Sequence, residues 1–133
     1  MFDIPAFILD AIRTIVEDVS LITNETALFI GEDGARITNN ANEIAHYEYG
    51  ASLASDSMLD AMNTLDIGVS ELELGDRLVR YGQHTSVTTI AAAGERFIKG
   101  NMFPTSRKVQ IGDPISMTVG YAGGLSSCAG YAV

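Results

Sequence analysis

The sequence predicts an α+β domain in which two helices pack on a curved, mainly antiparallel sheet, and two observations support this prediction. Two helical segments, residues 41–65 and 71–81, follow one another in the middle of the chain. The β-branched runs of the second half, which begin at residue 87, are short and are separated by turns and a loop rather than by helices. Helices that are segregated from neighbouring short strands are typical of an α+β fold.

Length and composition favour a single globular domain. The chain has 133 residues, of which 47% are hydrophobic and 19% are charged, so it has enough apolar side chains to close around one core. Seventeen acidic and eight basic side chains give a net charge of -9. Because a negative surface repels phosphate backbones, we expect no nucleic-acid partner.

Cysteine usage and hydropathy favour the cytoplasm. Cys128 is the single cysteine of the chain, so an intrachain disulfide is excluded, which fits a reducing compartment. No apolar run approaches the roughly 20 residues that span a bilayer. The N-terminus has no basic region followed by a long apolar core. We therefore expect a cytoplasmic protein without a membrane partner.

The first 40 residues are expected to hold a short amphipathic helix and small strands. Apolar side chains recur at three- and four-residue spacing over residues 4–17, which predicts a helix. Residues 19–23 and 27–31 have the composition of brief extended segments, and a turn follows at residues 31–34. We interpret residues 36–38 as the return strand.

The long predicted helix begins after Asn39 or Asn40, whose side chains can accept hydrogen bonds from free backbone amides. From residue 41 to about residue 65 the chain has no proline, and Gly50 is the one weak position. The expected packing face recurs every three or four residues. It comprises Ile44, Ala45, Ala51, Ala54, Met58, Leu59, Met62 and Leu65.

The second predicted helix covers residues 71–81 and follows Gly68, which stops the first helix. Ser70 and Glu73 have the spacing of a capping box, in which each side chain satisfies a free backbone amide of the other residue. We interpret Glu71 and Glu73 as residues whose charge favours the positive end of the helix, without a catalytic role.

The remaining segments are predicted to form the sheet. Residues 87–92, 115–121 and 125–133 have the composition of strands, and the last two meet across a glycine turn at residues 122–124. Residues 94–106 contain Gly, Asn, Pro and charged residues without a helical or alternating period, so they are predicted to be a loop.

Five short motifs occur in an order that resembles one known family. They are NEIA at residues 42–45, IGVSELEL at 67–74, AGE at 93–95, PTSRKVQIGD at 104–113 and the glycine hairpin that closes the chain. In this order they resemble the pita-bread family, which contains Xaa-Pro aminopeptidases, prolidases, methionine aminopeptidases and creatinase. The resemblance covers roughly residues 42–133 and favours the Xaa-Pro peptidase and creatinase branch.

The resemblance implies two similar αβ halves with the active site between them, of which this chain holds the first. Residues 1–40 are then the tail of a preceding amino-terminal domain or a lead-in helix with strands, and residues 41–133 are half of a pita-bread domain. We expect a fragment, a processed product or a naturally short relative. Its expected partner is the missing second half or, because an exposed sheet edge tends to bind another copy, a second chain in a homo-oligomer.

The same resemblance indicates where metal ligands would lie. In metal-dependent members, an Asp on one strand of the hairpin and a second Asp eleven residues later hold two cations that activate water. The matching positions in this chain are Thr118 and Ala129. Neither side chain offers the ionised oxygen that hard divalent cations need. We therefore predict no metal ligand and no cofactor.

The position expected to transfer protons is changed as well. The resemblance places a histidine seven residues after Gly94, where this chain has Asn101, and an amide cannot exchange a proton near neutral pH. His84 and Cys128 have no predicted partner, so we expect a solvated histidine and a strand cysteine. The candidate substrate-site residues are Asn101, Thr118, Cys128 and His84, and no catalytic residue is predicted.

These observations predict a truncated or degenerate relative of the Xaa-Pro peptidases and creatinase that is metal-free and not catalytic as the isolated chain. Two alternatives stay open. The chain is a non-enzymatic module that binds a peptide or a protein, since pita-bread domains without metal serve as such surfaces in a histone chaperone. Alternatively, it is a fragment of a creatinase-like hydrolase that acts on C–N bonds without metal.

Overall fold

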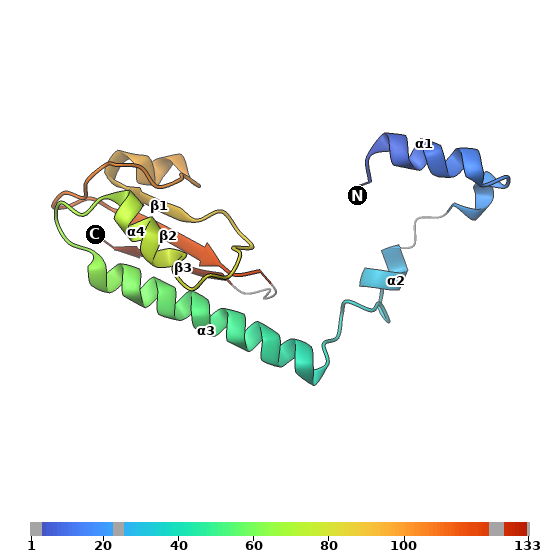
Figure 1. The fold of residues 1–133 in the computed structure, drawn as a ribbon, viewed down its shortest axis with the longest axis horizontal. Helices are drawn as coiled ribbons and strands as arrows, with labels where there is room; N and C mark the ends of the chain where they lie inside the picture. The colour runs from blue at the N-terminus through green and yellow to red at the C-terminus, as the bar shows by residue number, and fades with distance from the viewer. Residues whose placement is uncertain (1–3, 23–25, 123–126, 133) are drawn as a thin grey trace. The chain divides into compact units, whose positions relative to one another are not determined.

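The computed structural model describes residues 4–22, 26–122 and 127–132, and the chain divides into two compact units between residues 39 and 40 (Figure 1). Within these described residues, no helix combines the length and the apolar character needed to cross a membrane. The assignment of residues 1–40 to a preceding domain, and of residues 41–133 to half of a pita-bread domain, stays a prediction.

The first unit contains three short helical elements, namely α1 (Ala6–Ile15), the 3-10 helix η1 (Val19–Leu21) and α2 (Thr26–Ile30). α1 confirms the predicted first helix. The prediction of extended segments at residues 19–23 and 27–31 was wrong, because the described backbone there forms local hydrogen bonds and no strand ladder. The carboxylate of Asp18 accepts from the Ser20 amide at 3.0 Å and caps η1. Such side-chain and turn bonds satisfy backbone groups that a strand satisfies only with a partner.

The second unit places two helices against a three-stranded sheet (Figure 1). The helices are α3 (Ala41–Thr64) and α4 (Glu71–Leu78). The strands are β1 (Ile90–Ala93), β2 (Ile115–Gly120) and β3 (Ser127–Ala132), in the order β1-β2-β3. Both strand pairs are antiparallel. The mixed helix and sheet class predicted from the sequence is therefore confirmed.

Both helices of this unit begin with a capping box. The sequence predicted the box at Ser70 and Glu73, whereas for α3 it predicted only an asparagine cap. The Asn40 side chain accepts from the Glu43 amide at 3.0 Å, and the Glu43 carboxylate accepts from the Asn40 amide at 2.8 Å. Ser70 and Glu73 form the equivalent pair at α4, with distances of 3.2 and 2.8 Å. Each pair satisfies two of the free amides at a helix start, which fixes where α3 and α4 begin.

α4 ends at Leu78, three residues before the predicted end at residue 81. The hydroxyl of Tyr121 donates to the Leu78 carbonyl oxygen at 2.8 Å. In a longer helix this oxygen would accept from the amide four residues further on. The side chain of Tyr121, which directly follows β2, thus occupies the carbonyl oxygen that a further turn of α4 would use.

The packing face of α3 agrees with the predicted one in part, since Ala54 and Met58 are buried as expected. The side chains of Ile44, Leu59 and Met62 were expected to pack, yet their exposed fractions are 48%, 58% and 43%. The buried residues are mostly small and recur at helical spacing: Gly50, Ala54, Ser57, Met58 and Ala61. Small residues let the helix approach the sheet closely, and a Cβ added at Gly130 of β3 would lie 3.3 Å from the Met58 sulfur.

Ser57 is buried at this face because it has a polar partner. Its hydroxyl lies 2.5 Å from the hydroxyl of Tyr121. Since Tyr121 donates to the Leu78 carbonyl, Ser57 is the donor to Tyr121. One short chain of hydrogen bonds therefore joins α3, the end of β2 and the end of α4 inside the apolar core.

The segment between β1 and β2 is not wholly a loop, so that prediction was wrong in its first part. The 3-10 helix η2 (Gly94–Lys99) follows β1 directly. Gly94 has a φ of +60°, and its amide donates to the Pro114 carbonyl at 2.9 Å. A Cβ at Gly94 would collide with the Arg107 guanidinium and the Asp113 carboxylate. Only glycine fits both the φ angle and this close approach.

Candidate functional site

The residues of β2 alternate between buried and half-buried over most of the strand, whereas those of β1 are buried on both faces of the sheet. The alternate residues Ile115, Met117, Val119 and Tyr121 belong to the hydrophobic core with α3 and α4. Residues between them lie on the opposite side, because successive side chains of a strand point to opposite faces. We call this opposite side the second face. Its described side chains in β1 and β2 are Ile90, Ala92, Ser116 and Thr118.

Thr118 lies on the second face at the middle of the sheet. Its Cα pairs with that of Ile90 on β1 and with that of Ala129 on β3. Directly paired residues on neighbouring strands are the closest cross-strand neighbours of a sheet. The structure thus places side by side the two positions, Thr118 and Ala129, at which the resemblance expects carboxylates. The side chain of Ala129 itself lies outside the described residues.

Cys128 pairs with Val119 through the backbone register, so it alternates with Ala129 along β3. Val119 belongs to the hydrophobic core. The register therefore places Cys128 opposite a core position and not opposite Thr118. The side chain of Cys128 lies outside the described residues, so its expected character as an unreactive strand cysteine stays a prediction.

Asn101 and His84 are not brought to Thr118 by any hydrogen bond within the described part of the chain. Both residues are exposed. His84 lies beside the C-terminal end of β2, since its carbonyl oxygen accepts from the Ala122 amide at 2.6 Å. Asn101 follows η2, which leaves the sheet where β2 begins. The four candidate residues are thus distributed along the sheet and its connecting segments and do not form one cluster.

Ser116 is a neighbour on the second face that the sequence did not single out. Its hydroxyl oxygen is buried and has no hydrogen-bond partner among the described residues. Buried polar atoms of folded proteins nearly always have a partner. The Ser116 hydroxyl is therefore a buried polar group that the described residues leave without a partner.

Glu71 is the most connected polar side chain of the second unit, and its burial was not predicted. Its exposed fraction is 0%. The carboxylate accepts from the Ala93 amide at 2.8 Å, from the Thr105 amide at 2.9 Å and from the Thr105 hydroxyl at 2.6 Å. The Arg96 Nε donates to both of its oxygens, at 3.2 and 3.1 Å. A buried carboxylate with this many donors is stabilised where an unpaired one would not be.

The interpretation of Glu71 as a residue that only favours the helix dipole was therefore incomplete. Glu73, two residues later, does have the local role that its position predicts, because hydrogen bonds from the Ser70 amide and hydroxyl lower the pKa of its carboxyl group. The local pattern marks Glu73 as the capping partner of Ser70, but it gives no sign that Glu71 is buried. The difference depends on Arg96 and Thr105, which are 25 and 34 residues away in the sequence.

A second ion pair holds the segment that enters β2. The Arg107 guanidinium donates to both oxygens of Asp113, at 2.6 and 3.2 Å. Asp113 also accepts from the Gln110 amide at 2.9 Å. The hydrogen bond from Arg107 first, and that from the Gln110 amide next, hold the pKa of the Asp113 carboxyl group below its usual value. The same pair raises the pKa of the Arg107 guanidinium.

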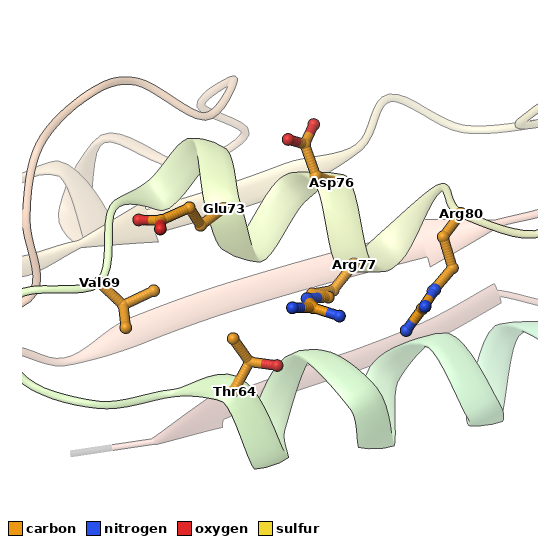
Figure 2. Close-up of a pocket in the computed structure, with 6 residues that line it drawn as sticks. All are labelled: Thr64, Val69, Glu73, Asp76, Arg77 and Arg80. Carbon is orange, nitrogen blue, oxygen red and sulfur yellow. The ribbon is translucent and has the colours of Figure 1, made fainter.

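A cavity of about 280 Å³ lies between the end of α3 and α4, away from the predicted site residues. Figure 2 shows the side chain of Arg77 lying between the two helices near Thr64, with Arg80 beyond the end of α4. The Arg80 guanidinium donates to the Asp60 carboxylate at 2.5 Å, which raises the pKa of Arg80, and Arg77 lies 3.8 Å from the same oxygen. Glu73 and Asp76 also line the cavity. The cavity is thus lined by acidic and basic side chains, and the pair of Arg77 on α4 with Asp60 on α3 connects the two helices.

A second cavity, of about 270 Å³, is lined by residues 65–67, 109–113 and 115. Neither of these cavities contains Thr118, Asn101 or His84. Over residues 4–22, 26–122 and 127–132, no group of three or more His, Cys, Asp or Glu side chains is arranged to hold a metal ion. The paired positions Thr118 and Ala129 thus lie in the sheet and outside both of these cavities.

Comparison with solved structures shows that this chain has part of the pita-bread fold. The Xaa-Pro dipeptidase from Bacillus anthracis is similar with a TM-score of 0.63 and 21% identity, over 72% of this chain and 29% of that protein. The prolidase from Pyrococcus furiosus is similar with a TM-score of 0.64 and 19% identity, over 74% and 31%. Aminopeptidase PepP of Pseudomonas aeruginosa gives a TM-score of 0.64 and 21% identity, over 72% and 23%.

The resemblance predicted from the sequence motifs is confirmed at the level of the fold. The chain spans less than a third of the length of these three proteins. No model of a known protein family matches the sequence. No curated protein matches it either.

Proposed function

We propose that this chain is a segment of a pita-bread protein that does not bind catalytic metal ions and does not hydrolyse peptides by itself. One observation carries the proposal. Thr118 and Ala129 are direct cross-strand neighbours at the middle of the sheet, and neither residue has an ionisable oxygen. Divalent cations that activate water need anionic oxygen ligands at such a position.

The rest of the second face supports the same proposal. Its other described side chains are Ile90, Ala92 and Ser116, so the face offers apolar groups and hydroxyls but no carboxylate or imidazole. A general base must lie within hydrogen-bond reach of the proton that it removes, directly or through one water molecule. Asn101, which takes the place of the expected histidine, cannot act as that base.

The experiment that tests this proposal uses the purified full chain, freed of metal by a chelator and then supplied with Mn²⁺, Co²⁺ or Zn²⁺. Calorimetry and elemental analysis measure metal binding, and release of proline from an Xaa-Pro dipeptide measures hydrolysis. We expect neither stoichiometric metal nor cleavage. Stoichiometric metal together with cleavage would show that the proposal is wrong.

A second candidate function is peptide or protein binding at the second face, and the Ser116 hydroxyl favours it. This oxygen is buried without a hydrogen-bond partner among the described residues, and the cross-strand partner of Ser116 on β1 is the apolar Ala92. An extended peptide that crosses the face would supply both a backbone hydrogen-bonding group and apolar contacts.

This candidate is tested by titrating the ¹⁵N-labelled chain with an Xaa-Pro dipeptide and with a longer proline-containing peptide. Binding at the second face would shift the backbone amides of β2, and Ser116→Ala would weaken it several-fold, since a hydrogen bond of this kind contributes about 1 kcal/mol. Ser52→Ala is the matched control, because the Ser52 hydroxyl is bonded within α3 to the Glu48 carbonyl at 2.9 Å. Equal affinity in the two variants would place the peptide elsewhere.

We also propose that the edge of the sheet finds a partner, either the second half of a pita-bread domain or another copy of this chain. β3 has one neighbouring strand, β2, within the described sheet. The backbone groups on the other edge of a strand in this position pair readily with another strand. Sedimentation that shows only monomers at micromolar concentration would argue against the homo-oligomer.

A further inference from the structure

The buried carboxylate of Glu71 holds two points of the chain that are twelve residues apart. At one point it accepts from the Ala93 amide, at the end of β1, and at the other it accepts from the amide and the hydroxyl of Thr105. Between these points lies the segment of residues 94–104. One side chain thus fixes both ends of this segment.

Arg96 extends the connection into the segment itself. Its Nε donates to Glu71, and its Nη2 donates to the Phe103 carbonyl oxygen at 2.8 Å. The guanidinium therefore joins the two sides of the segment to each other and to Glu71. Charge-assisted hydrogen bonds of this type are about twice as strong as neutral ones.

Backbone hydrogen bonds complete the attachment at the start of α4. The Glu71 amide donates to the Arg107 carbonyl at 2.9 Å, and the Leu72 amide donates to the Thr105 carbonyl at 3.0 Å. These are amides of the first helical turn, which have no partner within a helix. The helix start and the end of the segment thus satisfy each other.

The segment has few apolar contacts with the core: Phe97, Met102 and Pro104 are half-buried, and Pro104 packs against Gly75 of α4. The exposed fractions of Ile98 and Phe103 are 81% and 67%, and Lys99 and Asn101 are exposed. Of residues 94–104, Gly94 alone is buried. A segment with few buried apolar contacts depends on its hydrogen bonds to stay in one conformation.

We propose that Glu71 is a latch, which holds the segment of residues 94–104 closed and lets it open as one unit while the helices and the sheet stay folded. Glu71 is thereby the positioning residue for Asn101 and for the exposed side chains of Ile98 and Phe103. This inference does not depend on whether the chain binds a peptide or a metal.

Hydrogen exchange of the full native chain, followed by mass spectrometry, tests the latch. In Glu71→Gln we expect the amides of residues 94–104 to exchange at least about tenfold faster, since bonds to a charged group are lost. The amides of residues 54–61 in α3 and 115–120 in β2 are expected to keep their rates. Glu73→Gln is the matched control, since it removes a neighbouring glutamate that bonds only at the α4 cap, and it should leave residues 94–104 unchanged.

Two outcomes would overturn the proposal. One is an unchanged exchange rate over residues 94–104 in Glu71→Gln. The other is an equal acceleration over α3 and β2, because this would mean that Glu71 stabilises the whole unit. If Glu71→Gln does not fold, Arg96→Gln and Thr105→Val each remove one set of bonds to the carboxylate. Each is expected to accelerate exchange in residues 94–104 alone, and the same two outcomes apply.

Discussion

Replacing Tyr121 by Phe tests the hydrogen bonds that join α3, α4 and the sheet. The substitution removes one oxygen and keeps the ring, so the packing of the core is retained. It leaves the Leu78 carbonyl and the Ser57 hydroxyl buried without the bonds of 2.8 and 2.5 Å that they make to Tyr121. Each buried group left without a partner costs about 1–3 kcal/mol. Because Ser57 can turn toward a carbonyl of its own helix, we expect a total loss of about 2–4 kcal/mol in the free energy of unfolding.

The assay is urea unfolding followed by circular dichroism. With a slope of about 2 kcal/mol per M urea, the midpoint should fall by roughly 1–2 M. Tyr49→Phe is the matched control, because Tyr49 lies on α3 with an exposed fraction of 55%, and we expect a change of less than about 0.5 kcal/mol. A loss of the same small size in Tyr121→Phe would refute the assignment of these bonds to the core.

A double variant separates the lost bond from the ring itself. In the Tyr121→Phe background, Ser57→Ala removes a hydroxyl that has already lost its partner. We therefore expect Ser57→Ala to cost less there than in the native chain, by about 1 kcal/mol. Costs that simply add would mean that Ser57 and Tyr121 do not interact.

Three further predictions follow from individual positions. The double variant Thr118→Asp, Ala129→Asp should bind Mn²⁺ measurably by calorimetry, while each single variant does not. The reason is that two paired carboxylates are needed at one site. Equal binding by a single variant would contradict this prediction. Gly94→Ala should destabilise the chain by more than about 1 kcal/mol in urea unfolding and by more than Gly100→Ala, since both glycines have positive φ but only Gly94 lacks space for a Cβ. Asp113, followed by carbon NMR, should titrate at a pKa below that of the same residue in the unfolded chain, because Arg107 and the Gln110 amide donate to its carboxylate. Since folding lowers its pKa, the stability it contributes is present above the unfolded pKa and is lost as the pH falls through the folded pKa. Asp113→Asn should therefore flatten the acidic part of the pH dependence of unfolding, and an unchanged profile would contradict the assignment.

The tertiary structure changes the meaning of several residues that the sequence presents as alike. Glu71 and Glu73 both follow Ser70 at the start of α4, yet one is fully buried and the other is a surface cap. Ser57 belongs to the packing face of α3 although it is polar, whereas Leu59 is largely exposed. A pattern of apolar spacing cannot make these distinctions, because it contains no information about a polar partner elsewhere in the chain.

The first unit also shows that local composition does not by itself decide secondary structure. Residues 19–23 and 27–31 have a composition that suits strands, but a strand needs a neighbour with which to pair. The described residues of these segments form a 3-10 helix and an α-helix instead. Local composition favoured the extended form, and the absence of a pairing strand in the described part of this unit allowed the local hydrogen bonds to prevail.

The sequence by itself determined the features whose interactions are local. These are the asparagine cap of α3, the capping box of α4, the extent of α3, and the positions of β1, β2 and β3 within a few residues. Each depends on residues within a few positions of one another or on a motif that can be read along the chain.

The tertiary structure alone decided which side chains meet across the fold. Glu71 reaches residues 22, 25 and 34 positions away, and Ser57 meets Tyr121 across 64 positions. Such contacts form only when α3, α4 and the sheet close around one core, which buries these polar groups and requires that each find a partner. For this reason the latch at Glu71 and the hydroxyl pair at Tyr121 could not be predicted from the sequence, whereas the helices and strands that carry them could.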